Sequence, residues 1–264
     1  MNFKNITIGQ YVPGNSIIHR LDPRIKLAIS LVLIIGLFFI NTFWGYLFVA
    51  LFIFSIFAVA KIKISYVIRG IRPLMFILIL TFLLHVFMDA GEVLFKLGPL
   101  TATLEGTLAG LKMVIRLVLL VISTSCLTLT TSPMELTDGI ESILRPLQKI
   151  GVPAHEFAMM MTIALRFIPT LIEETDKIMK AQMARGADFE SGNILRRAKS
   201  MIPILVPLFV SAFRRADELA TAMEVRCYRG GKGRTRMKQL RFQITDLYAF
   251  LASVAIILAI VVPL

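Results

Sequence analysis

Charged side chains are scarce in this chain, at 17% of its 264 residues, and cysteines are scarcer still, with only two present. Cys126 lies in an apolar run and Cys227 beside a basic segment, without metal-ligand spacing, so neither a metal site nor a structural disulfide is expected. Hydrophobic residues instead make up 56% of the chain, well above the share in globular proteins. The composition indicates an integral membrane protein.

Acidic residues are also in deficit. Lys and Arg number 29 against 17 Asp and Glu, which gives a net charge of +12. In a soluble protein this excess would suggest nucleic acid, but the cytoplasmic loops of membrane proteins collect Lys and Arg for reasons of topology. We therefore expect the chain to meet the lipid bilayer and no nucleic acid.

The apolar runs predict an all-α membrane protein with about five transmembrane helices. They cover residues 27–44, 46–60, 73–88, 107–130 and 247–264. No small-residue cleavage site follows the first run, so it is interpreted as an uncleaved span. Asp22 and Pro23 are expected to cap its helix as N-cap and first residue. The third run is shorter than the roughly 20 residues a span needs, unless its flanks contribute.

The predicted organisation is an N-terminal membrane domain at 1–130 with about four spans, a domain of long amphipathic helices at 131–243, and a C-terminal transmembrane helix at 244–264. Basic residues concentrate before the first span, between the second and third, and throughout 140–241. With four spans ahead of the central region, these segments share one side. The positive-inside rule then places the N-terminus and the central domain in the cytoplasm.

The central domain contains two long helical patterns with similar ends. The first, expected from Ala154 to Arg185, ends in Ala184-Arg185-Gly186, and the second ends in Val225-Arg226-Cys227. Superimposing the two arginines also aligns Asp176 with Asp217. Gly186 is expected to take the left-handed conformation that stops a helix, and a similar stop is expected after Arg226.

An arginine at a helix C-terminus has two interpretations. It can simply interact with the negative end of the helix dipole. It can also project a guanidinium fork that holds a carboxylate through two hydrogen bonds. The repetition and the small neighbours Ala184 and Gly186 favour the second interpretation, since small side chains let a helix end enter a groove.

Further signals mark the helices around these ends. Ser132, Pro133 and Glu135 have the spacing of a capping box. The second long helix carries one apolar stripe, formed by Leu205, Leu208, Phe209, Ala212, Phe213, Ala216, Leu219, Ala220 and Met223. This pattern predicts an amphipathic helix that packs on protein or lies at the membrane surface, not a span.

Lys112 and Arg116 lie one helical turn apart inside the fourth apolar run. Charges within a span suggest a transport path or relay, but no acidic partner occurs in the other predicted spans. The structural interpretation is therefore preferred: Lys112 snorkels to the interface and Arg116 bonds a neighbouring helix.

Taken together, these motifs resemble the transmembrane T component of energy-coupling factor (ECF) vitamin transporters, over nearly the whole chain. The resemblance includes the run from His19 to Arg24, Thr130-Thr131-x-Pro133 and the run from Ala164 to Pro169. It also includes the two arginine motifs, of which the second has Val225 where the family more commonly has alanine.

The resemblance implies a four-subunit complex in the bacterial cell membrane. Two homologous cytoplasmic ATPases would bind ATP and Mg, and a membrane S component would capture the vitamin or metal. This chain would couple them without catalysing a reaction or binding a cofactor itself. The implied docking residues for the ATPases are Ala184, Arg185, Gly186, Val225, Arg226 and Cys227.

Two further segments are given roles from their composition. The segment 230–235 lacks the spacing of a phosphate-binding loop and is expected to be a flexible basic linker. Met159, Met160 and Met161 are predicted to contact the S component, because methionine suits surfaces that repack, although they could equally fill space in a membrane helix. Two alternatives stay open: a self-sufficient permease that uses Lys112 and Arg116, and a membrane scaffold with a basic cytoplasmic region.

Overall fold

The computed structural model describes residues 11–97, 100–189, 193–231, 240 and 242–261. Residues 232–235 of the predicted basic linker lie outside this part. The described residues form two compact units, one within Leu144–Met237 and one within Gly9–Ile143 and Lys238–Leu264. The division into domains at residues 131 and 244 stays a prediction.

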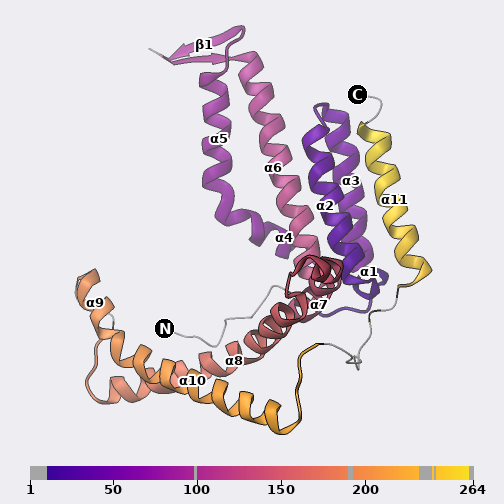
Figure 1. The fold of residues 1–264 in the computed structure, drawn as a ribbon. Helices are drawn as coiled ribbons and strands as arrows, with labels where there is room; N and C mark the ends of the chain where they lie inside the picture. Colours follow the sequence, from indigo (N-terminus) through magenta and orange to yellow (C-terminus); the bar gives the residue numbers. More distant parts are fainter. Residues whose placement is uncertain (1–10, 98–99, 190–192, 232–239, 241, 262–264) are drawn as a thin grey trace. The chain divides into compact units, whose positions relative to one another are not determined.

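The unit that holds most of the apolar runs is a helical bundle (Figure 1). Its helices are α1 (Ile17–Arg20), α2 (Pro23–Phe39), α3 (Phe43–Ala60), α4 (Ile64–Ile71), α5 (Met75–Met88), α6 (Leu104–Thr130), α7 (Pro133–Leu144) and α11 (Ile244–Val261). A core of buried side chains, among them Leu37, Tyr46, Ile53 and Leu129, packs α2, α3 and α6 together. Helices α5 and α6 lie side by side, and α11 packs on α2.

Among the described residues, five helical segments are long and apolar enough to cross a membrane, the number that the sequence predicts. They are Phe43–Ala60, Ile64–Met88, Leu104–Thr130, Ala154–Ala184 and Ile244–Val261. Their membership differs from the prediction, since Ala154–Ala184 is included whereas α2, with 17 residues, is not. Ala154–Ala184 has the lowest value of the five, a mean hydropathy of 1.2 over its most apolar 18 residues.

Two connections differ from their predictions. The expected basic loop at 61–72 is largely helical, because α4 and the 3₁₀ turn Arg72–Leu74 extend α5 into one segment of 25 residues. These flanks supply the length that the third apolar run lacks. For the stretch after α5 no secondary structure was predicted, and there β1 (Val93–Leu97) pairs antiparallel with β2 (Leu100–Thr103).

The predicted helix starts are confirmed. Pro23 is the first residue of α2, and the Asp22 carboxylate accepts a hydrogen bond from the Arg24 N–H at 2.9 Å. Ser132 and Glu135 form the reciprocal capping box, with the Glu135 N–H donating to the Ser132 hydroxyl and the Ser132 N–H to the Glu135 carboxylate.

A buried polar cluster, which the sequence analysis did not anticipate, joins distant parts of this unit. Asp246 at the start of α11 is 2% exposed and accepts hydrogen bonds from the N–H groups of Asp22 and Gln243, at 2.9 and 2.7 Å. The Lys26 ammonium donates to the carbonyls of His19 and Thr130, at 3.0 and 2.9 Å. These bonds tie the starts of α2 and α11 and the end of α6 to one another.

The second unit contains the 3₁₀ segment Arg145–Ile150 and the helices α8 (Ala154–Ala184), α9 (Ile194–Ser200) and α10 (Ile202–Val225). Helix α8 continues through Pro169, and α10 has Pro203 in its first turn and Pro207 inside. Helices α8 and α10 pack against each other (Figure 1). They are the two long helices that the sequence predicts, and each ends at an arginine.

Candidate functional site

Helix α8 ends in a Schellman motif at the first arginine. Arg185 is the C-cap, with φ −88° and ψ 7°. The Gly186 N–H donates to the Met183 carbonyl at 2.9 Å, and the Ala187 N–H to the Gln182 carbonyl at 3.0 Å. Gly186 has φ +86°, which confirms the predicted left-handed stop.

Helix α10 ends in the same way. Arg226 is its C-cap, with φ −84° and ψ 14°. The Cys227 N–H donates to the Glu224 carbonyl at 2.8 Å, and the Tyr228 N–H to the Met223 carbonyl at 2.9 Å. The left-handed position is occupied by Cys227, at φ +56°. The two ends therefore share cap conformation and hydrogen-bond pattern, which gives the sequence repeat a structural basis.

All six predicted docking residues are exposed. They are Ala184, Arg185, Gly186, Val225, Arg226 and Cys227. Val225, which precedes the second arginine, is 78% exposed. Within the described part of the chain, neither the Arg185 nor the Arg226 guanidinium has a hydrogen-bond or ion-pair partner. Both forks are therefore available to a carboxylate from another molecule.

A polar contact fixes how α8 and α10 cross. Glu174 of α8 accepts a short hydrogen bond from the Ser211 hydroxyl of α10 and pairs with Arg215 at 3.2 Å. Near the start of α8, the Met159 sulfur accepts a hydrogen bond at 3.0 Å from the hydroxyl of Tyr228, which follows the end of α10. Met159 precedes Glu174 in the chain, whereas its partner Tyr228 follows Ser211, the partner of Glu174. The two helices therefore run antiparallel.

The antiparallel arrangement sends the two arginines in opposite directions. From the Glu174 contact, Arg185 lies 11 residues along α8 and Arg226 lies 15 residues beyond Ser211 along α10. At 1.5 Å per residue the two ends are roughly 40 Å apart if both helices are straight. One rigid helix pair thus presents two equivalent cationic ends at separate places.

Residues 14–237 match the family model described as cobalt transport protein, CbiQ. The chain is also 62% identical over 250 residues to the energy-coupling factor transporter transmembrane protein EcfT of Thermosediminibacter oceani, covering 95% of this chain and 94% of the relative. The proteins of the same name from Clostridium kluyveri and Bacillus subtilis are 57% and 48% identical, covering 96% and 89% of this chain and 95% and 89% of theirs.

The chain belongs to the family of energy-coupling factor transporter transmembrane proteins. The resemblance noted from its motifs is therefore confirmed, and the chain is a transporter component of the cell membrane.

The contact at Glu174 was missed by the sequence analysis. Ser211 and Arg215 lie one turn apart on α10, but this helix carries several other polar and charged residues, so the sequence does not single them out. The predicted apolar stripe is correspondingly split. Leu208, Ala212, Leu219 and Met223 are partly buried, whereas Leu205, Phe209 and Phe213 are 45%, 61% and 68% exposed.

The three predicted methionine contacts are placed differently from one another. Met160 and Met161 are 57% and 41% exposed, so they are available to a partner. Met159 is partly buried and receives the Tyr228 hydrogen bond. Its role within the helix pair is thus structural, and a contact with another subunit stays a prediction.

Lys112 and Arg116 have the structural surroundings that the sequence analysis preferred. Arg116 donates to the Tyr46 hydroxyl at 3.1 Å, to the Ile40 carbonyl at 2.9 Å and to the Asn41 side chain at 3.2 Å. The Lys112 ammonium lies 5.3 Å from the centre of the Phe43 ring. Both cations therefore hold α6 against the connection between α2 and α3, in agreement with the structural interpretation.

Proposed function

We propose that this chain is the coupling subunit of an ECF-type importer. It would transmit the ATP-driven movement of two homologous cytoplasmic ATPases to a membrane S component that binds a vitamin or metal. The observation that carries the proposal is the pair of equivalent, exposed arginine ends on one antiparallel helix pair. Two matching ends, held well apart, suit two matching partners.

The chemistry of each end suits a groove with an acidic residue. Arg185 and Arg226 present planar guanidinium groups that can hold a carboxylate through two hydrogen bonds. Their exposed neighbours Ala184 and Gly186 are small enough to enter a groove, whereas Val225 makes the second end wider. The Glu174 contact ties both helices together, so a displacement at either end is passed to the other.

The same proposal assigns the remaining partners. ATP and Mg would be held by the ATPases, with no cofactor bound to this chain. The S component would choose the substrate, and the exposed apolar side chains of α8 and α10 are candidate contacts for it. These include Met160, Met161, Phe209 and Phe213.

The proposal requires α8 and α10 on the cytoplasmic side. The distribution of Lys and Arg supports that orientation. In a background without Cys126 and Cys227, single cysteines at Lys63 and at Lys96 should react with an impermeant thiol reagent from opposite sides of intact cells. Reaction of both from the same side would refute the orientation.

The decisive test is assembly of the double variant Arg185→Ala, Arg226→Ala with the ATPases. We expect the variant to insert into the membrane but to lose both ATPases on purification, together with transport. The matched control is Lys177→Ala, Arg214→Ala, which removes two positive charges from exposed sites on the same two helices. Normal assembly and transport by the first variant would refute the proposed coupling role.

A further inference from the structure

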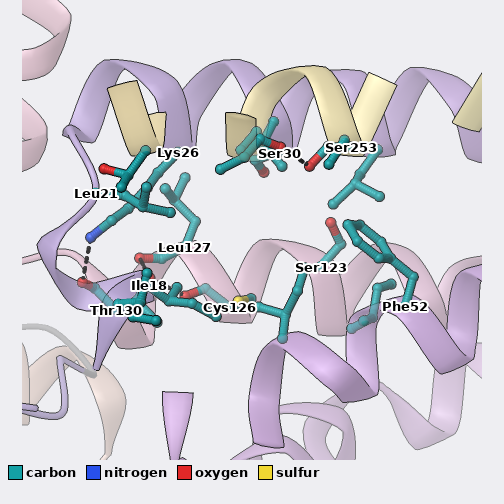
Figure 2. Close-up of a pocket in the computed structure, with 18 residues that line it drawn as sticks. Ile18, Leu21, Lys26, Ser30, Phe52, Ser123, Cys126, Leu127, Thr130 and Ser253 are labelled. Atoms are coloured by element: carbon teal, nitrogen blue, oxygen red, sulfur yellow. Dashed lines mark hydrogen bonds between the residues drawn. The ribbon is translucent and has the colours of Figure 1, made fainter. Parts of the chain in front are cut away.

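A cavity of about 240 Å³ lies among α1, α2, α3, α6 and α11, entirely within the membrane-helix unit (Figure 2). Its walls are mainly apolar, with Leu33, Phe52, Ile53 and Leu127 among them. Water gains few hydrogen bonds from walls of this kind, so an apolar occupant is favoured.

The mouth of the cavity is assigned between α3 and α11 from the exposure of its lining residues, although Ile17 of α1 is also 68% exposed. On the α11 side, Thr245 and Ala252 are exposed, and on the α3 side, Phe52 and Ile56 are partly buried. Both helices are long and apolar enough to cross the membrane. Exposed apolar side chains flank the opening on both helices, among them Leu51, Phe54, Tyr248 and Leu251. The medium at the opening is therefore the hydrocarbon of the bilayer.

One fully buried hydroxyl in the wall has no partner among the described residues. Ser123 of α6 is 3% exposed, and its hydroxyl makes no hydrogen bond in the described part of the chain. The other hydroxyls in this part of α6 each donate to a carbonyl of their own helix: Thr124, Ser125, Thr128 and Thr130. Ser253 across the cavity does the same.

Figure 2 shows Ser30 and Ser253 on one side of the cavity and Ser123 and Cys126 on the other. Because a buried hydroxyl without a partner is unfavourable, the Ser123 hydroxyl indicates an occupant that brings an oxygen acceptor.

The charges at one end of the cavity favour a neutral ligand. Lys26 lines this end, but its ammonium already donates to two carbonyl oxygens. The carboxylates of Glu135, Asp22 and Asp246 act on the same ammonium. Because the Lys26 ammonium is already engaged by these groups, a neutral ligand is favoured over an anionic one.

We propose that this cavity binds one acyl chain of a neutral membrane lipid, which enters between α3 and α11. The chain fills the apolar space, and an ester oxygen of the lipid accepts the hydrogen bond of the Ser123 hydroxyl. The site is independent of the docking role proposed for Arg185 and Arg226, because it lies in the other unit and uses none of the same residues.

The site can be tested with the full-length chain in phosphatidylcholine vesicles that contain a phosphatidylcholine with a photoreactive diazirine in one acyl chain. After illumination, lipid adducts are mapped by proteolysis and mass spectrometry. We expect adducts on the cavity residues of α6, including Cys126, in addition to those on outward-facing side chains such as Phe54. Adducts confined to outward-facing residues would overturn the proposal.

Two pairs of variants make the test specific. Ala252→Phe places a ring at the mouth of the cavity and should lower the cavity adducts at least tenfold. Ala259→Phe lies two turns further along the same face of α11 and should leave them unchanged. Equal cavity labelling in these two variants would overturn the proposal.

The second pair tests the hydroxyl with a change too small to disturb folding. Ser123→Ala should reduce cavity labelling about fivefold. Ser125→Ala, which removes a hydroxyl bonded to its own helix, should leave labelling unchanged. Unchanged labelling in Ser123→Ala would overturn the assigned role of the hydroxyl.

Discussion

The ends of α8 and α10 have the same backbone geometry but reach it differently. At the end of α8, Gly186 occupies the left-handed position, and nothing lies within 4 Å of where its Cβ would be. At the end of α10, Cys227 occupies that position, at a conformational cost of about 1–2 kcal/mol.

Tertiary contacts accompany the strained end. Tyr228, directly after Cys227, bonds the Met159 sulfur of α8, and Gly231 lies so close to the His155 ring that no Cβ would fit there. The end of α8 is thus specified locally by glycine, whereas the end of α10 is held in place by packing on α8. The two ends share the exposed arginine cap, which glycine stabilises at the end of α8 and packing stabilises at the end of α10.

The largest effect is expected from removing one arginine at a time. Arg185→Ala and Arg226→Ala should each weaken the binding of one ATPase by about 2–5 kcal/mol, because an acidic partner in the groove would lose its counter-charge. The number of ATPases bound per chain, measured by native mass spectrometry, should fall from two to one in each variant. A loss confined to one of the two variants would break the equivalence of the ends.

Lysine at either position should give a smaller loss. Arg185→Lys and Arg226→Lys keep the charge but cannot form two parallel hydrogen bonds to a carboxylate. We expect each to weaken ATPase binding by about 1–3 kcal/mol, between wild type and alanine. Titration of detergent-purified chain with ATPase measures this directly, and full affinity with lysine would show that the fork geometry is not used.

The contact that joins the helices should affect both ends together. Glu174→Ala leaves Arg215 without its partner and should destabilise the helix pair by about 1–3 kcal/mol. Asp176→Ala is the matched control, since its pair with Lys180 at 2.6 Å lies within one helix and is exposed, and it should cost less than about 0.5 kcal/mol. Amide hydrogen exchange in α8 and α10 reports both values. Equal exchange in the two variants would contradict the role given to Glu174.

The smallest effects concern the left-handed positions, and they have opposite signs. Gly186→Ala should destabilise the end of α8 by about 1 kcal/mol, and Cys227→Gly should relieve strain at the end of α10 by up to about the same amount. Exchange of the Ala187 and Tyr228 amides, which donate the outer Schellman bonds, should speed up in the first variant and slow down in the second. If both exchange rates changed in the same direction, the two helix ends would differ in more than the residue at the left-handed position.

Much of the local structure could be predicted from sequence because it depends on residues three or four apart. The cap formed by Asp22 and Pro23, the capping box of Ser132 and Glu135, and the stop at Gly186 are all confirmed. The hairpin of β1 and β2 and the helix α4 were not predicted. Apolar strand residues inside a membrane protein carry little signal of their own, and α4 has the basic residues of a typical loop.

The site was predicted only in part. The six docking residues were chosen from the sequence, and their role stays a prediction, but their exposure and the matched caps are observed. Glu174 could not be singled out among its charged neighbours, because its partners lie 37 and 41 residues further along the chain. Nothing in a single sequence specifies which charged residue of one helix meets which face of another.

Composition, hydrophobic period and cap residues act locally, so they predict a membrane protein with two long helices, each stopped at an arginine. The folded chain adds that these helices run antiparallel and direct their arginines apart. It also shows that Asp246 bonds Asp22 across 224 residues and that Cys227 takes a left-handed conformation. Those features depend on which surfaces pack together, and packing brings together residues whose separation in the chain gives no signal of their contact.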